Sequence, residues 1–212
     1  ANSTIYGEKI AHSIMADVLN PGEHESEVKE ALKGSDIILD ISTSIAAARY
    51  ISLDVDSDAR RVSMFLNPTG HDAVLLAESK DRDITLDFIE MQYYRQLVNE
   101  QLTEHLPAST GYIRYSNSCR DMSSFVSQEN IAMYSGLLSK AFRSVIEEEN
   151  GSIRIWSTDP EGYSVSYKCF YPSEIQKMSC GEWTLYTDEF LIDKMQELRK
   201  AKLPNETGGI LI

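Results

Sequence analysis

The spacing of apolar residues predicts an α/β fold with a mainly parallel sheet, followed by a smaller α+β segment. Over residues 5–77, helix-like and strand-like patterns alternate, as in sheets whose strands are joined by helices. The stretch Asp36–Ile41 holds four apolar residues between turn formers, which is typical of a parallel strand buried on both faces. After residue 127, one long helical pattern precedes alternating strands, which predicts the α+β segment.

In the first half, the patterns begin with a helix whose apolar residues recur mostly at helical spacing until Asn20, Pro21 and Gly22 end it. Ser44 is a suitable N-cap for a later helix, because its hydroxyl can accept a backbone N–H of the first turn. Helices are expected at 5–19, 25–33 and 44–48, and strands at 36–41, 61–66 and 73–77.

In the second half, a helix is expected over 83–102, because its apolar residues recur on one face and Pro107 prevents its extension. Residues 108–124 are rich in Ser, Thr, Gly and Asn and indicate an irregular connection. Ser127 is the expected N-cap of the next helix. The remaining elements are a helix to residue 147, a hairpin of strands 152–157 and 163–171, a strand at 183–186 and a helix at 188–201.

Composition excludes several functions. The 212 residues carry 20 Lys and Arg against 33 Asp and Glu, a formal net charge of −13, which argues against non-specific nucleic-acid binding and against an anionic membrane surface. No apolar run approaches the roughly 18 residues of a membrane span. The four histidines show no metal-binding spacing, and three cysteines cannot all pair. Free thiols indicate a reducing cytoplasm.

Asp40 is the first candidate functional residue. It stands at the carboxyl end of the predicted buried strand, where open α/β sheets bind ligands, and it is followed by the small polar residues Ser42, Thr43 and Ser44. A carboxylate there could hold Mg²⁺ on a nucleotide. The alternative is an ordinary strand end followed by a helix cap.

Cys119 is the candidate nucleophile. It lies in a polar, Ser-rich segment beside Arg120, whose positive charge would favour the thiolate. The alternative is an unreactive thiol in a connection. Cys169 lies in an alternating strand pattern and Cys180 precedes a glycine, so both are interpreted as structural.

Two further residues are weaker candidates. Lys9 follows Gly7 and Glu8 near the start of a predicted helix and could reach a phosphate, although a solvated surface lysine is the simpler interpretation. Glu206 precedes Gly208 and Gly209 and a β-type apolar run, where the alternative is a surface residue of a linker. The glycines form no phosphate-binding loop motif.

Taken in order, these pieces resemble a ThiF-type, ubiquitin-activating-like adenylation domain. The resemblance rests on Gly7–Lys9, Asn20-Pro21, the Asp36–Asp40 strand, Arg49 on the next helix and the strand pair around Gly70. It covers about residues 5–77, and extends less closely to residue 150. It implies a partial Rossmann-like sheet and adenylation, with MgATP, of the C-terminal glycine of a ubiquitin-like or sulfur-carrier protein.

The resemblance also assigns roles. Lys9 would contact ATP, and Asp40 would hold Mg²⁺, because Thr43 stands where the family carries its Mg²⁺-linked Asp. Either Asp40 substitutes for that residue or adenylation is weakened or lost. The family's paired zinc-binding cysteines are absent, whereas Cys119 fits the place of a catalytic cysteine ahead of a late helix and would form a thioester.

The tail from Glu206 to Ile212 resembles the opening strand of JAB/JAMM metalloisopeptidases, in which the glutamate is the general base. Their zinc ligands are not in this chain. Both ends look cut, so we expect a fragment of a bacterial fusion protein, inactive alone. The expected parts are 1–106, the end of a ThiF-like domain; 107–200, a crossover segment, helix and hairpin; and 201–212, a linker and first JAB-like strand.

Partners are expected accordingly. The carrier protein is the main one, with a conjugating enzyme and a second copy in a homodimer as open additions, and neither nucleic acid nor membrane is expected. The rival hypothesis is a non-catalytic ThiF-like interaction domain that presents a ubiquitin-like protein to a fused JAB peptidase. A third hypothesis is an α/β domain with a small-molecule site unrelated to ATP.

Overall fold

The computed structural model describes residues 11–42, 44–102, 105–106, 126–159 and 161–205. The first half comprises η1 (Gly22–His24), α2 (Glu25–Lys33), β1 (Ile37–Asp40), α3 (Ile45–Arg49), the π-helical turn η2 (Tyr50–Asp54), β2 (Arg60–Leu66), β3 (Asp72–Ala77) and α4 (Leu86–Asn99). The second half comprises α5 (Gln128–Glu147), β4 (Ser152–Thr158), β5 (Val165–Phe170), β6 (Gln176–Cys180), β7 (Trp183–Thr187) and α6 (Glu189–Lys202).

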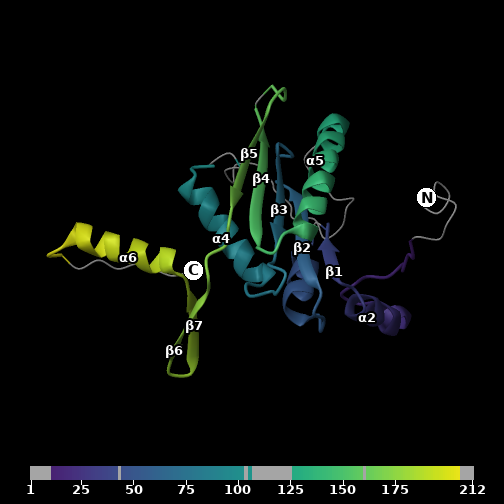
Figure 1. Cartoon of the computed structure of the whole chain (residues 1–212), viewed down its shortest axis with the longest axis horizontal. Helices are drawn as coiled ribbons and strands as arrows, with labels where there is room; N and C mark the ends of the chain where they lie inside the picture. Colours follow the sequence, from purple (N-terminus) through teal and green to yellow (C-terminus); the bar gives the residue numbers. More distant parts are fainter. Residues whose placement is uncertain (1–10, 43, 103–104, 107–125, 160, 206–212) are drawn as a thin grey trace.

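The main sheet has five strands in the order β1-β2-β3-β4-β5, and only the first pair among these described strands is parallel (Figure 1). The α/β class is confirmed, but the expectation of a mainly parallel sheet is wrong. The reason is the short turn between β2 and β3, which forces an antiparallel pair, whereas β1 and β2 are joined by the longer crossover through α3 and η2. Both halves of the chain share this sheet, because β3 pairs with β4.

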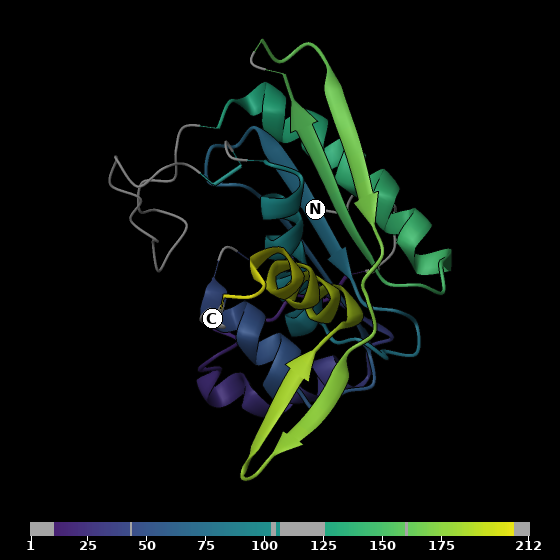
Figure 2. The ribbon, with the colours of Figure 1, turned by 90° about the vertical axis from the view of Figure 1, so that its left-hand side faces the viewer.

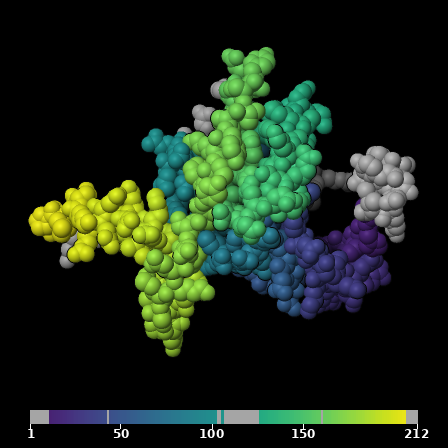
Figure 3. Space-filling model, in the orientation of Figure 1, coloured from purple at the N-terminus to yellow at the C-terminus, as the bar shows by residue number. Residues whose placement is uncertain are grey.

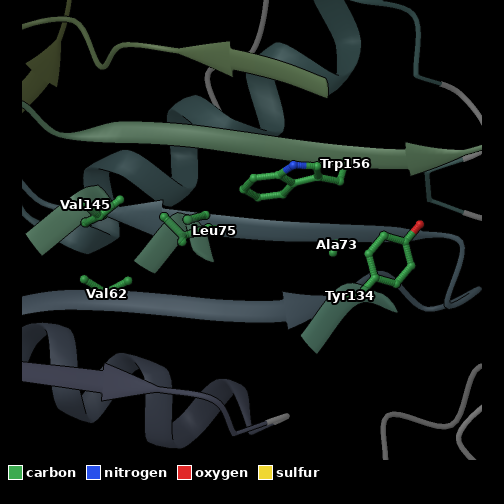
Figure 4. Close-up of a cluster of buried hydrophobic side chains, with 8 residues drawn as sticks. Val62, Ala73, Leu75, Tyr134, Val145 and Trp156 are labelled. Carbon is green, nitrogen blue, oxygen red and sulfur yellow. The ribbon is translucent and has the colours of Figure 1, made fainter. Parts of the chain in front are cut away.

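Two helices cover the sheet on opposite faces, so the body has three layers (Figures 1 and 2). Side chains alternate across β3, so that Ala73 and Leu75 pack under α5 while Val74 and Leu76 pack under α4. Figure 4 shows the α5 side, where Tyr134 and Val145 of α5 meet apolar residues of β2, β3 and β4: Val62, Ala73, Leu75 and Trp156. The α4 side buries the face predicted for that helix: Leu86, Ile89, Tyr93 and Leu97.

The two N-caps expected from sequence are confirmed, whereas the helix expected over 5–19 is wrong in its described part. Ser44 and Ser127 accept backbone N–H bonds from Ala47 and Asn130, as expected for N-caps. The helix expected over 5–19 does not form in its described part, 11–19, where Asp17 and Asn20 make an isolated bridge instead. Met15 is 94% exposed, so this segment has no core to pack against, and a short helix without tertiary packing is marginal in water.

The end of the described chain forms an arm, which we define as residues 173–205. It contains the two-stranded sheet β6–β7 and α6, and in Figures 1 and 3 both project from the body. β7 and α6 match the expected strand and helix, whereas β6 was not predicted. None of the described helices combines the length and the apolar character needed to cross a bilayer.

Candidate functional site

Asp40 is the last residue of β1 and is 4% exposed. Its Oδ1 accepts the backbone N–H of Ser42 at 2.9 Å, which is the local bond that turns the chain out of the strand. Two residues later Ser44 caps α3, with its hydroxyl 3.3 Å from the N–H of Ala47. A buried carboxylate is therefore fixed where β1 ends and its crossover begins.

A charged pair from two helices lies near this carboxylate. Arg49 Nη1 at the end of α3 is 3.0 Å from a carboxylate oxygen of Glu90 on α4. Burial raises the pKa of Glu90; the positive charge of Arg49 opposes this, and the negative charges of Asp87 and Asp40 reinforce it. Asp40 and Glu90 therefore act on each other electrostatically. Glu90 could not be picked out from sequence, because its partner Arg49 lies on another helix, 41 positions away.

Asp40 meets the minimum requirement for a Mg²⁺ ligand. Mg²⁺ in nucleotide sites is commonly held by one or two carboxylates, while phosphates and waters complete its octahedron. Among the described residues, no group of three or more His, Cys, Asp or Glu side chains is arranged to hold a metal by itself. Asp40 could therefore hold Mg²⁺ only together with ligands from outside the protein, such as phosphate oxygens.

A buried polar network lies at the turn between β2 and β3. Asp72 Oδ2 lies 2.5 Å from His105 Nδ1, and His105 Nε2 lies 2.5 Å from the hydroxyl of Tyr93. Asn67 Nδ2 donates to the same Asp72 oxygen at 3.1 Å and to the carbonyl of His105 at 3.0 Å. Tyr93 and His105 are each 2% exposed, and burial raises the pKa of Tyr93. These groups have no access to a substrate, so the network holds His105 on the turn.

The same turn also receives the segment that starts α5. Gly70 has φ +72°, and a Cβ there would lie 2.5 Å from Cγ2 of Val126. His105 and Val126 thus fasten both flanks of residues 107–125 to the turn at 67–72. Because β1 and β2 are parallel, this turn lies toward the same end of the sheet as Asp40, although Asp40 is level with Ser63 and β2 continues to Leu66 before the turn.

Two buried arginines, adjacent in β2, serve the backbone rather than a ligand. Arg60 donates to the carbonyls of Glu78, Val145, Glu148 and Asn150. Arg61 donates to the carbonyls of Ile51, Val55 and Ala59, which fixes the η2 crossover against the start of β2. Burial lowers the pKa of both side chains.

An open cleft of about 600 Å³ lies at the start of β2, at the end of the strands opposite to the one where Asp40 lies. Ser52 and Asp87 meet there, since the Ser52 hydroxyl accepts the N–H of Asp87 at 3.0 Å. Arg82 on its wall already pairs with Glu78, at 2.8 Å, and donates to the carbonyl of Ser57. The two arginines of the cleft wall, Arg61 and Arg82, are therefore occupied by partners within the protein, while Asp56 and Asp58 also line the cleft.

Most of the site residues predicted from sequence lie in parts of the chain that the structure does not describe. Lys9, Thr43, Cys119 and Glu206 lie outside the described residues, so the structure brings only Asp40 of the five into view. Cys169 is half-buried and Cys180 is exposed, and neither forms a disulfide.

Comparison with protein-family models gives no match to this chain, and comparison with curated proteins gives none either.

Proposed function

We propose that this chain is part of a ThiF-like, ubiquitin-activating-like protein that adenylates the C-terminal carboxylate of a ubiquitin-like or sulfur-carrier protein with MgATP. The observation that carries the proposal is the placement of Asp40. A buried carboxylate at the end of a parallel strand, followed by a small-residue turn, suits a magnesium-nucleotide site. The parallel β1–β2 pair would then belong to the Rossmann-like part of the fold.

In this mechanism, one oxygen of the carrier carboxylate attacks the α-phosphorus of ATP, and pyrophosphate leaves. Mg²⁺ would neutralise phosphate charge, and Asp40 is the residue that would hold it. Lys9 would contact the phosphates. The Arg49–Glu90 pair lies within electrostatic range of Asp40, whose negative charge helps to raise the pKa of Glu90.

The second step would use Cys119. Its thiolate attacks the acyl carbon of the carrier adenylate, a thioester forms and AMP leaves; Arg120 would favour the thiolate. Support comes from the flanks of its segment, since His105 and Val126 are both fastened to the turn at 67–72. That turn lies toward the same end of the sheet as Asp40, beyond Ser63, the residue of β2 that pairs with Asp40.

The experiment uses the longest natural reading frame that encodes this chain, with MgATP and a candidate carrier. A conjugate that thiols release, and that is lost in Cys119→Ser, supports both steps. AMP–carrier without a conjugate restricts the proposal to adenylation. Neither product, from protein shown to be folded, overturns it.

The second candidate is a ThiF-like interaction domain without catalysis, which presents a ubiquitin-like protein to a JAB peptidase that would begin at Glu206. The specific observation in its favour is the arm, whose large apolar side chains include Trp183 at 80% exposure. Stable binding of the carrier in the absence of ATP would favour it. We place either protein in the cytoplasm, since its cysteines are expected to be free thiols.

A further inference from the structure

The arm is fixed at its base but is not packed along its length. Three contacts on one side of α4 hold the base. The ring of Phe88 packs against Tyr186, and the side-chain amide of Gln92 makes two hydrogen bonds to the backbone of Ser173. Arg95 forms a salt bridge with Asp188. Phe88, Gln92 and Arg95 are spaced i, i+4 and i+7, so they share one face of α4. Beyond these contacts, α6 has no buried residue.

One face of α6 is an apolar stripe. Leu191, Met195 and Leu198 are spaced i, i+4 and i+7, and Lys202 continues the same line. Met195 is 51% exposed and Leu198 is 53% exposed. Large side chains in this pattern normally lie against another element, but here Met195 and Leu198 are exposed and Leu191 is half-buried in the described part of the chain.

Charge is arranged asymmetrically around the stripe. On a helical projection, Lys194 flanks one side of the stripe and Arg199 flanks the other, while Lys202 stands at its end. Glu189, Asp193 and Glu197 are spaced i, i+4 and i+8, and they lie on the opposite face. Lys194 pairs with Glu197 at 3.3 Å, so the positive charge at the stripe that takes part in no described ion pair comes from Arg199 and Lys202, in a chain whose formal net charge is −13.

The hairpin of β6 and β7 adds a second apolar face, on which Trp183 is exposed and Leu185 is half-buried. Tyr186 points toward Phe88 and the body. Its neighbour Leu185 therefore belongs to the other face, where it lies opposite Met178, and Trp183 lies opposite Cys180. Trp and Met are enriched at the centres of protein interfaces. This face of the hairpin, like the stripe on α6, therefore has the composition of a protein interface.

We propose that the α6 stripe is a docking surface for a partner protein whose own apolar strip, helical or extended, is bordered by carboxylates. Charge complementarity selects this occupant. A second copy pairing through α6 would bring the Arg199 and Lys202 side chains of the two stripes together, and Glu197, the carboxylate nearest the stripe, already pairs with Lys194. An acidic-bordered partner would satisfy Arg199 and Lys202 while it covers Leu191, Met195 and Leu198, and it would add a second carboxylate to Lys194 beside Glu197. This inference does not depend on adenylation.

The test measures binding of two fluorescent synthetic amphipathic helical peptides to the full chain by anisotropy. Both peptides carry leucines on one face; one carries glutamates beside them, and the other carries lysines at the same positions. We expect the glutamate peptide to bind at least about tenfold more tightly, and added salt to reduce the difference, because the charges are exposed. Equal affinities, or binding of neither peptide, would overturn the proposal.

Variants locate the site. Met195→Ser with Leu198→Ser should abolish binding without changing Tm, since both side chains are exposed, whereas Val98→Ser on α4, an equally apolar and 77% exposed position, should leave binding intact. Lys194→Glu with Arg199→Glu should reverse the preference to the lysine peptide. If sedimentation instead shows a dimer that Leu198→Ser dissociates, a second copy covers the stripe and the proposal is wrong.

Discussion

Gln92 holds the backbone of Ser173 with both ends of its side-chain amide. Its Nε2 donates to the Ser173 carbonyl at 2.8 Å, and its Oε1 accepts the Ser173 N–H at 2.7 Å. The two residues are 81 positions apart, and Gln92 is 4% exposed. This paired bond fixes the point at which the arm leaves the body, so the direction of the arm is set by α4.

Gln92→Met should release the arm. The change removes both hydrogen bonds and leaves Ser173 without its protein partners, which we expect to cost about 1–3 kcal/mol of arm stability. Hydrogen exchange should therefore accelerate over 173–205 and remain unchanged over β2–β4. Gln96→Met, at a half-buried position on the same helix, is the matched control. Uniform acceleration over the whole chain would show that Gln92 stabilises the body rather than the arm.

Gly70 and Val126 give a test of the close approach at the turn. Gly70→Ala should destabilise the protein for two reasons, the contact with Val126 and the left-handed backbone at φ +72°. The backbone part alone costs about 1–2 kcal/mol. Val126→Ala in the Gly70→Ala background should relieve the steric part and leave the backbone part. Chemical denaturation of the two single variants and the double variant measures both, and strictly additive effects would contradict the contact.

Tyr93→Phe should destabilise the protein, because it leaves His105 Nε2 buried without its partner at 2.5 Å. The expected loss is about 1–3 kcal/mol in the free energy of unfolding. Tyr94→Phe, at the exposed neighbouring tyrosine, should cost much less. Equal losses in the two variants would mean that the Asp72–His105–Tyr93 network does not stabilise the turn.

Glu90 and Glu148 should show opposite pH dependences. The folded pKa of Glu90 is raised above 4.5, chiefly by burial, so its ionisation opposes folding as the pH rises above that value. The change in the free energy of unfolding caused by Glu90→Gln should therefore be more favourable near neutral pH than below pH 4.5. Arg49, which is 42% exposed, remains solvated in this variant.

Glu148 is the matched carboxylate. Burial acts to raise its pKa, but hydrogen bonds from Arg154 and Ser144 outweigh burial and lower it below 4.5. Its stabilisation is present above pH 4.5 and is lost as the pH falls through the lowered folded pKa. Glu148→Gln should destabilise near neutral pH and have little effect in acid. Urea midpoints over this pH range measure both variants, and the same sign of effect in both would contradict the two environments.

What could be predicted from sequence was local. Ser44 and Ser127 cap helices because capping needs only the residues of one turn. The buried face of α4 followed from its spacing. Strand direction did not follow, because it depends on which strands pair across the chain. β6 has no buried residue, and it exists only through its pairing with β7.

The candidate site was likewise predictable only where it depends on residues close together in the sequence. Asp40 was found because a strand end is visible in sequence. Glu90 and His105 were missed, since their importance comes from partners, Arg49 and Asp72, that only the tertiary structure brings near. The burial of the two arginines of β2 also depends on tertiary structure, because the backbone carbonyls that accept their hydrogen bonds come from several other elements.

Carrier-dependent exchange of pyrophosphate into ATP is the most direct test of the proposed function, because it reports carboxylate adenylation without requiring the thioester step. With the longest natural reading frame that encodes this chain, we predict exchange with an intact carrier and none with a carrier that lacks its C-terminal glycine. Asp40→Asn should reduce the rate by more than about tenfold while the protein remains folded. No exchange with any ubiquitin-like or sulfur-carrier protein, or exchange that Asp40→Asn leaves unchanged, would contradict the account.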